Sequence, residues 1–402
     1  MYFTLSWRNI WRNKKRTLIA AASVFFAVIM AIIMRSAQIG SYAYMIHSSA
    51  KLYTGYLQIQ GEGYWDNRSM NRSISPSEDD YEFIRSAPHV VSATPRLEGF
   101  ALVSNDTATK VAQVIGTDPE LENNMTDLKD KLIKGAYLKS DSDGVLVAEG
   151  LMKMLKLQVG DSLVLYGQGY HGQMAAAIYP VAGFIKMPFQ ELNNSLVFLN
   201  LKTAQRFYSA PDRITSLAIM IDKQSHLDET IHHLKKLEKY AVMRWEEMLP
   251  DMYQSIQLDN ASGIIMLIIL YIVITFGVFG TIMMMVSERY KEFGVLISVG
   301  MRKWRLMIIT TLESVFVAFV GVIAGIIGSI PLVYYMHHNP IYFTGAATQT
   351  FEAMGVEPIF YFSTDSVIFF SQAVVVLIIA LASAIYPVLF IRKLEPVEAL
   401  HS

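Results

Sequence analysis

The chain has 402 residues, a net charge of −1 and a mean hydropathy of +0.32. Its 52% of hydrophobic and 17% of charged residues make it too apolar for an ordinary soluble enzyme and too polar for a chain made only of membrane spans. The near-neutral charge gives no reason to expect a nucleic-acid partner. The lack of cysteine excludes disulfides, thiolate catalysis and Cys-based metal sites.

Four long apolar runs account for the excess hydrophobicity, at 18–34, 264–286, 306–336 and 367–391. A helix that crosses a bilayer needs about 20 apolar residues, so each run is long enough for a span. A long basic segment precedes the first run and no small-residue cleavage motif follows it, which favours an uncleaved span over a signal peptide. We therefore expect four transmembrane helices.

Basic residues indicate which loops face the cytoplasm. They gather in the N-terminal tail, in the segment 287–305 and in the C-terminal tail, whereas 337–365 contains neither Lys nor Arg. Both termini and 287–305 are therefore predicted to be cytoplasmic. The expected order is a cytoplasmic amphipathic segment 1–17, a span 18–39, an external domain with a helical stalk 40–262, a span 263–286, a cytoplasmic coupling segment 287–305, a span 306–336, an external loop 337–365, a span 366–391 and a cytoplasmic tail 392–402.

The external block has the pattern of a mixed α/β domain. Ser77 begins a capping box that predicts a short helix. Strand-like runs occur at 97–104, 110–115, 145–148, 162–166, 177–185, 195–199 and 214–221, and helical spacing at 149–157, 202–208 and 225–239. The segment 245–263 is predicted to be a continuous helical stalk that leads into the second span. The predicted fold class is an α-helical membrane protein with four transmembrane helices and a large α/β domain inserted between the first two.

Motifs that would indicate an enzyme are weak or missing in this sequence. Gly167, Gly169 and Gly172 have the spacing of a dinucleotide fingerprint, but a strand follows where that fingerprint needs a helix, so they predict a glycine-rich hairpin. The adjacent histidine pairs at 232–233 and 337–338 lack nearby carboxylate spacing, and we predict no metal site there. The chain contains no phosphate-binding G-x-x-x-x-G-K-[ST] loop and no plausible catalytic constellation. We expect no catalytic residue, and no cofactor or metal bound by this chain.

Glu313 is the one charge within the third apolar run. It lies eight residues beyond Arg305, which is about 12 Å along a helix at ~1.5 Å per residue. An ionisable group at that depth needs a partner or a wet cavity. Structural pairing and a role in coupling or gating both stay open.

The polar segment between the second and third runs carries a family resemblance. It reads ERYKEFGVL at 288–296, then VGMR at 299–302 and LES at 312–314. These motifs resemble the signature of FtsX-like (MacB-type) ABC transporter permeases. The basic start at 8–17 and the end at 387–400 are similar to the ends of that family, and 145–151 and 157–161 resemble its periplasmic core domain. With its length, four spans and large external domain, the chain is most similar to the lipoprotein-releasing permease subunits.

This resemblance implies a location and partners. It implies a multi-pass protein of the bacterial inner membrane with a periplasmic domain, which helps to extract lipoproteins for transfer to a carrier. The implied partners are a cytoplasmic ABC ATPase dimer that holds ATP and magnesium, a second permease copy or a diverged sibling, membrane lipids, the lipoprotein substrate and a periplasmic carrier.

The resemblance also implies which residues carry the coupling. The implied ATPase-coupling residues are Glu288, Arg289, Lys291, Glu292, Phe293, Gly294, Gly300 and Arg302, with Glu313 as the intramembrane coupling candidate. Tyr290, Phe293 and Ile297 share one apolar helix face, which we expect to lie in a groove of the ATPase; the alternative is an amphipathic helix that lies on lipid.

In the lipoprotein-releasing subunits, a hairpin at the position of 166–174 can recruit the carrier. Its candidate residues here are Gly167, Gly169, Tyr170, His171, Gly172 and Met174. They depart from the proline- and arginine-bearing hook of the family, so a simple surface hairpin stays open. Two other functions also stay open: a mechanotransmission permease of a MacB-type tripartite efflux system, and an FtsX-like regulator of cell-wall hydrolases.

Overall fold

The protein is described by a computed structural model that covers Ser6, Arg8 and residues 14–105, 108–139, 142–342 and 359–395. Its chain forms two compact units. The helical unit holds the described residues up to Tyr42, those from Ser255 to Tyr342 and those from Ile359 onward. The α/β unit holds the described residues between Ala43 and Gln254.

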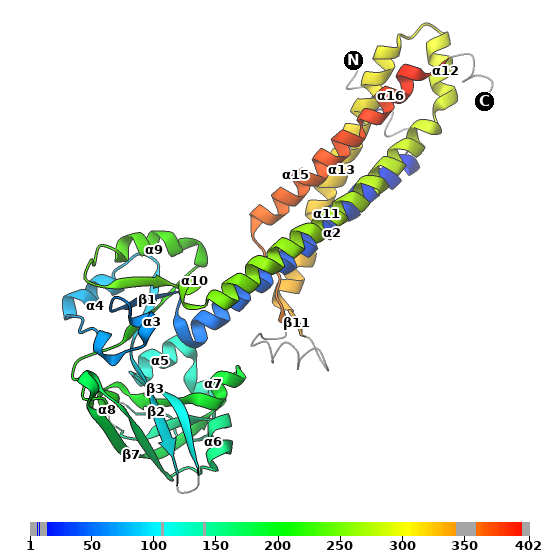
Figure 1. Ribbon diagram of the computed structural model, residues 1–402. Coiled ribbons are helices and arrows are strands. Elements are labelled where there is room, and N and C mark those ends of the chain that lie inside the picture. The colour runs from blue at the N-terminus through cyan, green and yellow to red at the C-terminus, as the bar shows by residue number, and fades with distance from the viewer. Residues whose placement is uncertain are drawn as a thin grey trace. The chain divides into compact units, whose positions relative to one another are not determined.

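Within the described residues, four helical stretches are long and apolar enough to cross a membrane. They are built from α2 (Lys14–Ser49), α11 (Pro250–Ser287), α13 (Lys303–His338) and the consecutive pair α15 (Ser366–Ser383) and α16 (Ile385–Lys393), which Figure 1 shows together with the short α12 (Tyr290–Ser298). The prediction of four spans is confirmed. Two short strands, β11 (Ile341–Tyr342) and β12 (Ile359–Phe360), pair antiparallel beyond α13, and the part of the predicted external loop at 343–358 lies outside the described residues.

Small residues let α13 approach α2 closely. A Cβ atom on Gly321 would lie 2.6 Å from the Cβ of Val24, and one on Gly325 would lie 2.7 Å from the Cβ of Val28. The two glycines are four residues apart, which is the small-xxx-small spacing by which membrane helices bring their backbones together. The apolar core of the bundle lies around this contact, with Val28 and Ile32 fully buried.

Proline sets two helix boundaries that were not predicted. The predicted stalk is not continuous from residue 245: α10 (Trp245–Met248) ends at Leu249, and α11 begins at Pro250. Proline disfavours helical backbone at the residue before it and is well suited to the first position of a helix. From Pro250 onward the helix runs without a break into the second span, as predicted, and Gly263 lies inside α11. The last span is likewise divided at Ala384, because Pro387 cannot donate a hydrogen bond to the preceding turn.

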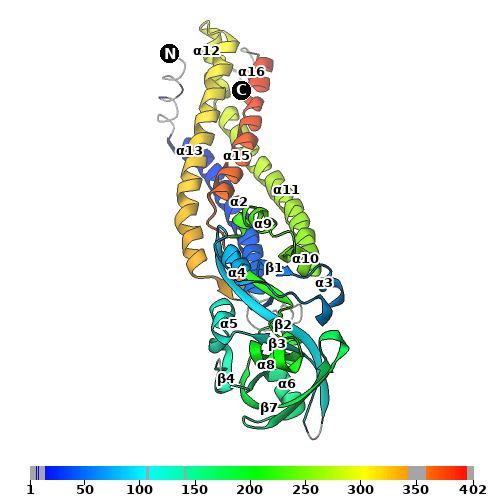
Figure 2. The same ribbon diagram turned by 90° about the vertical axis from the view of Figure 1, so that its left-hand side faces the viewer.

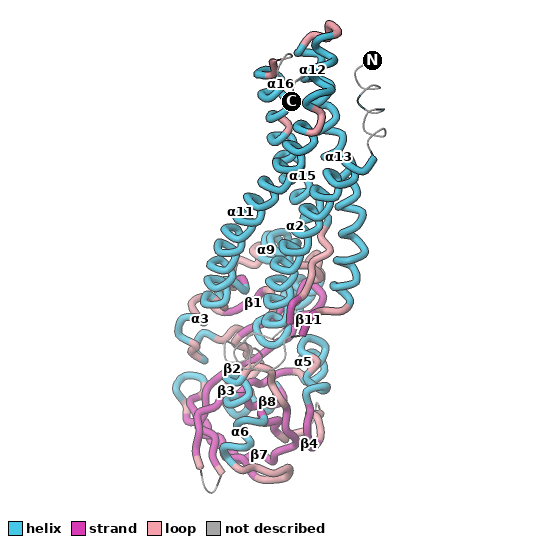
Figure 3. Tube along the Cα trace, turned by 90° about the vertical axis from the view of Figure 1, so that its right-hand side faces the viewer, coloured by secondary structure: helices cyan, strands magenta, loops and turns pink. Residues whose placement is uncertain are grey.

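The α/β unit is built on a mixed sheet. Its strands are β1 (Leu57–Gln60), β2 (Val90–Ser104), β3 (Thr109–Thr117), β4 (Leu132–Gly135), β5 (Val145–Ala148), β6 (Ser162–Gln168), β7 (Met174–Ile185), β8 (Leu196–Asn200), β9 (Ser216–Ile221) and β10 (Ala241–Arg244). The order is β10-β1-β9-β2-β3-β8-β5-β7-β4, and β6 pairs with both β2 and β7. The pairs β3–β8 and β5–β7 are parallel, and the other pairs are antiparallel. Figure 3 shows these strands with helices around them, so the predicted α/β domain is confirmed.

The helices of this unit are short, and all but α10 lie between strands in the sequence. They are α3 (Tyr64–Asn67), α4 (Glu78–Arg85), α5 (Pro119–Thr126), α6 (Glu149–Leu155), α7 (Gln190–Ser195), α8 (Leu201–Phe207), α9 (Leu227–Leu234) and α10. The capping box before α4 is confirmed, because Ser77 and Asp80 exchange backbone and side-chain hydrogen bonds. The helix expected to reach residue 239 ends at Leu234, since the chain then turns towards β10.

A buried ion pair fixes α5 against the sheet. The Nη2 and Nε atoms of Arg96 on β2 lie 2.6 and 2.9 Å from the two carboxylate oxygens of Glu122 on α5. Thr117 on β3 donates a third hydrogen bond to the same carboxylate at 3.0 Å. Arg96 is 1% exposed and Glu122 is fully buried. Such a pair is stable only with this bidentate geometry, since each ion has lost its water.

Removing one partner of this pair should therefore destabilise the domain strongly. We expect Glu122→Ala to lower the free energy of unfolding by about 3–5 kcal/mol, because the Arg96 guanidinium stays buried without its counter-ion. Thermal unfolding of the detergent-solubilised full chain measures this. Glu120→Ala is the matched control, since Glu120 pairs with Lys129 in solvent and such pairs contribute about 0–1 kcal/mol. Equal effects of the two substitutions would contradict the assignment.

Candidate coupling site at α12

The polar segment between α11 and α13 folds as a short helix with a defined end. Figures 1 and 2 show α12 at one end of the helical unit, close to α16. The helix ends in a Schellman motif: Gly300 N–H donates to the Ile297 carbonyl, and Met301 N–H donates to the Leu296 carbonyl, both at 3.0 Å. Gly300 has a φ of +103°, in which a residue with a side chain would be strained. Gly300 therefore fixes the turn from α12 to α13.

The apolar face expected to contact an ATPase instead packs inside the helical unit. Phe293 is fully buried, and Tyr290 and Ile297 pack against the apolar core of the bundle. The rings of Tyr290 and Phe390 on α16 meet edge to face with centroids 5.7 Å apart. The chain's own helices thus cover Phe293 fully and Tyr290 and Ile297 in part, and contact of this face with an ATPase stays a prediction.

The opposite face of α12 is exposed and carries a second apolar group. Val299 is 83% exposed and Val295 is 47% exposed, with Leu296 beside them. Lys291 and Glu292 are also exposed on this helix. We call these five residues the outer face of α12. A shallow groove lies next to it, lined by Ser287, Glu288, Tyr290, Lys291 and Phe390.

A buried ion pair joins the beginning of α12 to the third span. Arg289 Nη1 donates a hydrogen bond to Glu313 Oε2 on α13, and the two residues are 6% and 4% exposed. The Arg289 guanidinium also lies 5.2 Å from the centre of the Phe293 ring and donates from Nε to Glu292 Oε2 at 3.2 Å. The buried guanidinium of Arg289 thus links the exposed carboxylate of Glu292 to the buried carboxylate of Glu313. The structural pairing considered for Glu313 is present, and its partner is Arg289.

The other predicted coupling residues differ in their accessibility. Gly294 is buried in α12, where its carbonyl accepts a hydrogen bond from Ser298 Oγ at 2.9 Å. Arg302 is exposed and is the N-cap residue of α13. Lys303 was not predicted: its Nζ donates to the Leu394 carbonyl at 2.7 Å, at the end of α16. Cations that hydrogen-bond the last carbonyls of a helix are common, but only the fold brings Lys303 to α16.

The predicted hairpin 166–174 is confirmed as a turn between β6 and β7, and its tip is attached to the domain. Tyr170 N–H donates to the Tyr208 carbonyl at 2.8 Å, and the Arg213 guanidinium lies 4.5 Å from the centre of the Tyr170 ring. His171 N–H donates to Asn71 Oδ1 at 2.8 Å, while the His171 side chain is exposed. A Cβ on Gly169 would lie 2.4 Å from the Tyr208 carbonyl oxygen, so this close approach requires glycine. Tyr170 is therefore half-buried and packs on the core.

Next to this tip, the solvent side of the sheet is apolar. Alternate residues of β2, β3, β6 and β7 point outward, and Met174 is 73% exposed. Together with Gly167, Gly172 and the glutamines beside them, these side chains line an open groove. We call the exposed apolar residues the outer sheet face: Phe100, Leu102, Val111, Val164, Tyr166, Met174 and Ile178. Contiguous exposed apolar surface of this kind marks protein or lipid contact sites.

The buried pair Arg289–Glu313 leads to a testable stability pattern. We expect Glu313→Leu to lower the free energy of unfolding by about 3 kcal/mol, because Arg289 remains buried and charged. The double variant Arg289→Met/Glu313→Leu should regain most of this loss, since apolar residues of similar volume can replace a buried ion pair. Thermal unfolding in detergent distinguishes the single variant from the double variant. A double variant as unstable as Glu313→Leu would argue against the pair.

The hairpin provides a second prediction with an adjacent control. Tyr170→Ala should lower the midpoint of thermal unfolding by several degrees, because it removes a ring that packs on the core and under Arg213. His171→Ala should leave that midpoint nearly unchanged, since its side chain is exposed. If His171→Ala were the more damaging change, the placement of this tip would be wrong.

Known families match both units. The family described as the FtsX-like permease C-terminal domain matches residues 264–396, and the MacB-like periplasmic core domain matches 17–237, which is more than half of the chain. A lipoprotein-releasing system transmembrane protein LolC of Xylella fastidiosa is 23% identical over 331 residues, which cover 78% of each chain. A LolE protein of Haemophilus influenzae is 25% identical over 231 residues, covering 54% of each chain.

Among solved structures, the periplasmic region of MacB from Actinobacillus actinomycetemcomitans is similar with 16% identity and a TM-score of 0.34, covering 49% of this chain and 91% of that chain. The four apolar helices, the α/β domain between the first two of them and the two family matches agree with one another. The chain therefore belongs to the FtsX-like permeases with a MacB-like periplasmic core domain, and it is a transmembrane permease subunit of an ABC-type transporter.

Proposed function

We propose that this permease works with a separate cytoplasmic ABC ATPase to extract lipoproteins from the inner membrane and pass them to a periplasmic carrier. The similarity to LolC and LolE proteins supports this substrate class, since their names describe a lipoprotein-releasing system. The motif at 288–302 lies at one end of the helical unit, where a soluble subunit can reach it. In this arrangement both termini and α12 face the cytoplasm, as the basic residues of the short loops favour.

The outer face of α12 is the surface that we assign to the ATPase. Its apolar residues Val295, Leu296 and Val299 supply area that a partner can desolvate, and Lys291 and Glu292 can fix the orientation. The single observation that carries the proposal is the connection behind this face, from Glu292 through Arg289 to Glu313. A partner that displaces Glu292 acts on Arg289, and Arg289 is bonded to the third span.

We assign contact with cargo and with a second permease to α11. Of the four apolar helices, α11 is the least covered by the rest of the chain, with only 17% of its most apolar window buried. Its exposed side chains include Ile265, Ile272 and Phe276. An acyl chain needs only an apolar surface of this kind, so a lipoprotein can approach from the bilayer, between the first and second spans of paired permeases. The pair is completed by a second copy or by a diverged sibling.

Carrier contact is assigned to the outer sheet face rather than to the tip of the hairpin. Tyr170 is engaged with Arg213 and with the core, whereas Tyr166 and Met174 are exposed in a groove. A carrier of acylated proteins must itself present an apolar surface, which such a groove can match. Gly167 and Gly172 line this groove without a side chain and so leave it open.

A second candidate is the mechanotransmission permease of an efflux system. It is favoured by the similarity to a macrolide export ATP-binding/permease protein MacB of Vibrio parahaemolyticus, which is 22% identical over 326 residues covering 78% of this chain and 49% of that protein. Copurified partners distinguish the two functions, because an efflux permease would copurify with a periplasmic adaptor and an outer-membrane duct. A regulator of cell-wall hydrolases would instead copurify with a hydrolase activator.

The proposal is tested on the outer face of α12. We expect Val299→Asp combined with Leu296→Asp to reduce copurification of an ATPase at least tenfold and to abolish lipoprotein release, because two carboxylates would be buried at the contact. Glu292→Ala should retain the ATPase but uncouple ATP hydrolysis from release. The measurements are mass spectrometry of the detergent-purified complex and a release assay in proteoliposomes.

Met154→Asp is the matched control for these variants. Met154 is an exposed apolar residue on a helix of the α/β unit. Its substitution therefore tests the effect of an added carboxylate at an exposed apolar position without changing α12. Undiminished ATPase binding by the Val299→Asp/Leu296→Asp variant would refute this coupling surface. A complex without an acylated protein but with an adaptor and a duct would favour the efflux function.

A further inference from the structure

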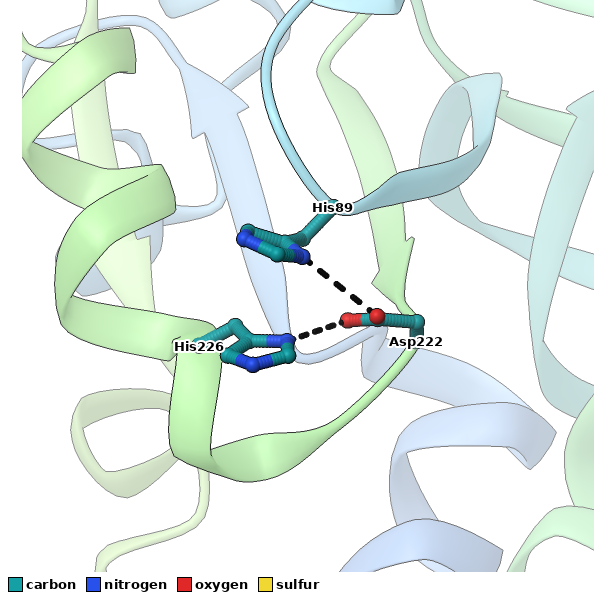
Figure 4. Close-up of side chains that lie close together, drawn as sticks. All are labelled: His89, Asp222 and His226. Carbon is teal, nitrogen blue, oxygen red and sulfur yellow. Dashed lines mark hydrogen bonds and ion pairs between the residues drawn. The ribbon is translucent and has the colours of Figure 1, made fainter.

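Two histidines and an aspartate from distant parts of the sequence meet in the α/β unit. His89 lies just before β2, Asp222 follows β9, and His226 ends the short turn η5 (Gln224–His226) before α9. Figure 4 shows both imidazole rings on the same side of the Asp222 carboxylate. The permease function described above uses none of these residues.

The ligand atoms of the three residues converge. His89 Nδ1 lies 3.4 Å from Asp222 Oδ2, and His226 Nδ1 lies 2.8 Å from Asp222 Oδ1. All three ligand atoms lie within 4.8 Å of one another. Zinc–nitrogen and zinc–oxygen bonds are about 2.0–2.2 Å long, so two ligand atoms on a tetrahedral ion are separated by roughly 3.3–3.6 Å. The two separations given above end on different oxygens of Asp222, so with one carboxylate oxygen as ligand the three ligand atoms, which lie within 4.8 Å, need to close by up to about an ångström around such an ion.

A further carboxylate lies beside the cluster. Glu229 Oε2 on α9 lies 3.4 Å from His89 Nε2, the ring nitrogen on the side away from Asp222. Metal-ligating histidines commonly donate their second ring nitrogen to a carboxylate, which fixes the tautomer and the ring orientation. Glu229 is placed to do this for His89.

The backbone holds the ligands in place before any ion binds. Asp222 N–H donates to the His89 carbonyl at 3.1 Å, and Thr230 Oγ1 on α9 donates to the Pro88 carbonyl at 3.1 Å. His89 has a φ of +67°, in the left-handed region that residues with side chains seldom adopt. A residue is kept in such a conformation only where the surrounding structure holds it, and these positions concentrate at functional sites.

We propose that His89, Asp222 and His226 bind a divalent cation of the zinc class, with Glu229 as the hydrogen-bonding partner of His89. Two imidazoles and one carboxylate favour zinc and its transition-metal neighbours, whereas calcium and magnesium prefer oxygen ligands. Three protein ligands leave one position of a tetrahedral ion for water. The ion would connect the loop between α4 and β2 to the turn between β9 and α9. This inference does not depend on the proposed function.

The test is zinc binding to the untagged full chain in detergent after treatment with a chelator. Equilibrium dialysis with metal analysis should give about one zinc ion per chain at this site. We expect Asp222→Asn and His226→Ala each to weaken binding at least tenfold, and excess magnesium or calcium not to compete. Cobalt should give visible absorption bands in the wild-type chain that are lost in His226→Ala.

Two variants separate metal binding from folding. His89→Gly removes a ligand and suits the positive φ, so it should keep the midpoint of thermal unfolding without metal while losing zinc binding. His232→Ala removes an exposed histidine of α9 outside the cluster and should bind zinc as the wild type does. Zinc binding that is equal in His89→Gly and the wild type, or no binding by the wild type, would overturn the proposal and leave a hydrogen-bonded cluster only.

Discussion

The ion pair between Arg289 and Glu313 is the constraint on which the α12 end of the helical unit depends. Two charges that are nearly inaccessible to water are tolerable only because each neutralises the other. Arg289 precedes α12, and Glu313 lies one-third of the way along α13. The pair therefore fixes the position of α12 against the third span, while the Schellman end at Gly300 fixes the turn that joins them.

This constraint decides which face of α12 can meet a partner. With Arg289 held inward, the side chain of Phe293, one helical turn further on, is also directed into the bundle, where it packs below the guanidinium. Tyr290 and Ile297 follow it inward, and Val295, Leu296 and Val299 are left on the outside. One apolar face of this short helix is thus used for packing within the chain, and a second and smaller apolar group remains exposed.

The sequence was sufficient for the architecture but not for the orientation of α12. Long hydrophobic runs located the four spans, and a short apolar run located strands such as β5, because both signals are local. The face of α12 depends on a partner 24 residues away on another helix, and periodicity does not distinguish burial in the same chain from burial in a second chain. The start of the stalk, by contrast, follows from a local signal, because Pro250 disfavours helical backbone at Leu249 and so separates α10 from α11.

The histidine cluster illustrates the limit of spacing arguments. Asp222 and His226 are four residues apart, which is a local signal, but His89 is 133 residues away from Asp222 and reaches it only because β2 and β9 pair. The adjacent histidine pairs that the sequence brings to attention are poor ligand sets, since neighbouring residues point in different directions. Convergence requires strands that lie side by side, so a site of this type follows from sheet topology.

The same reasoning explains Lys303, whose partner at the end of α16 is brought near only by the packing of the last span against α13.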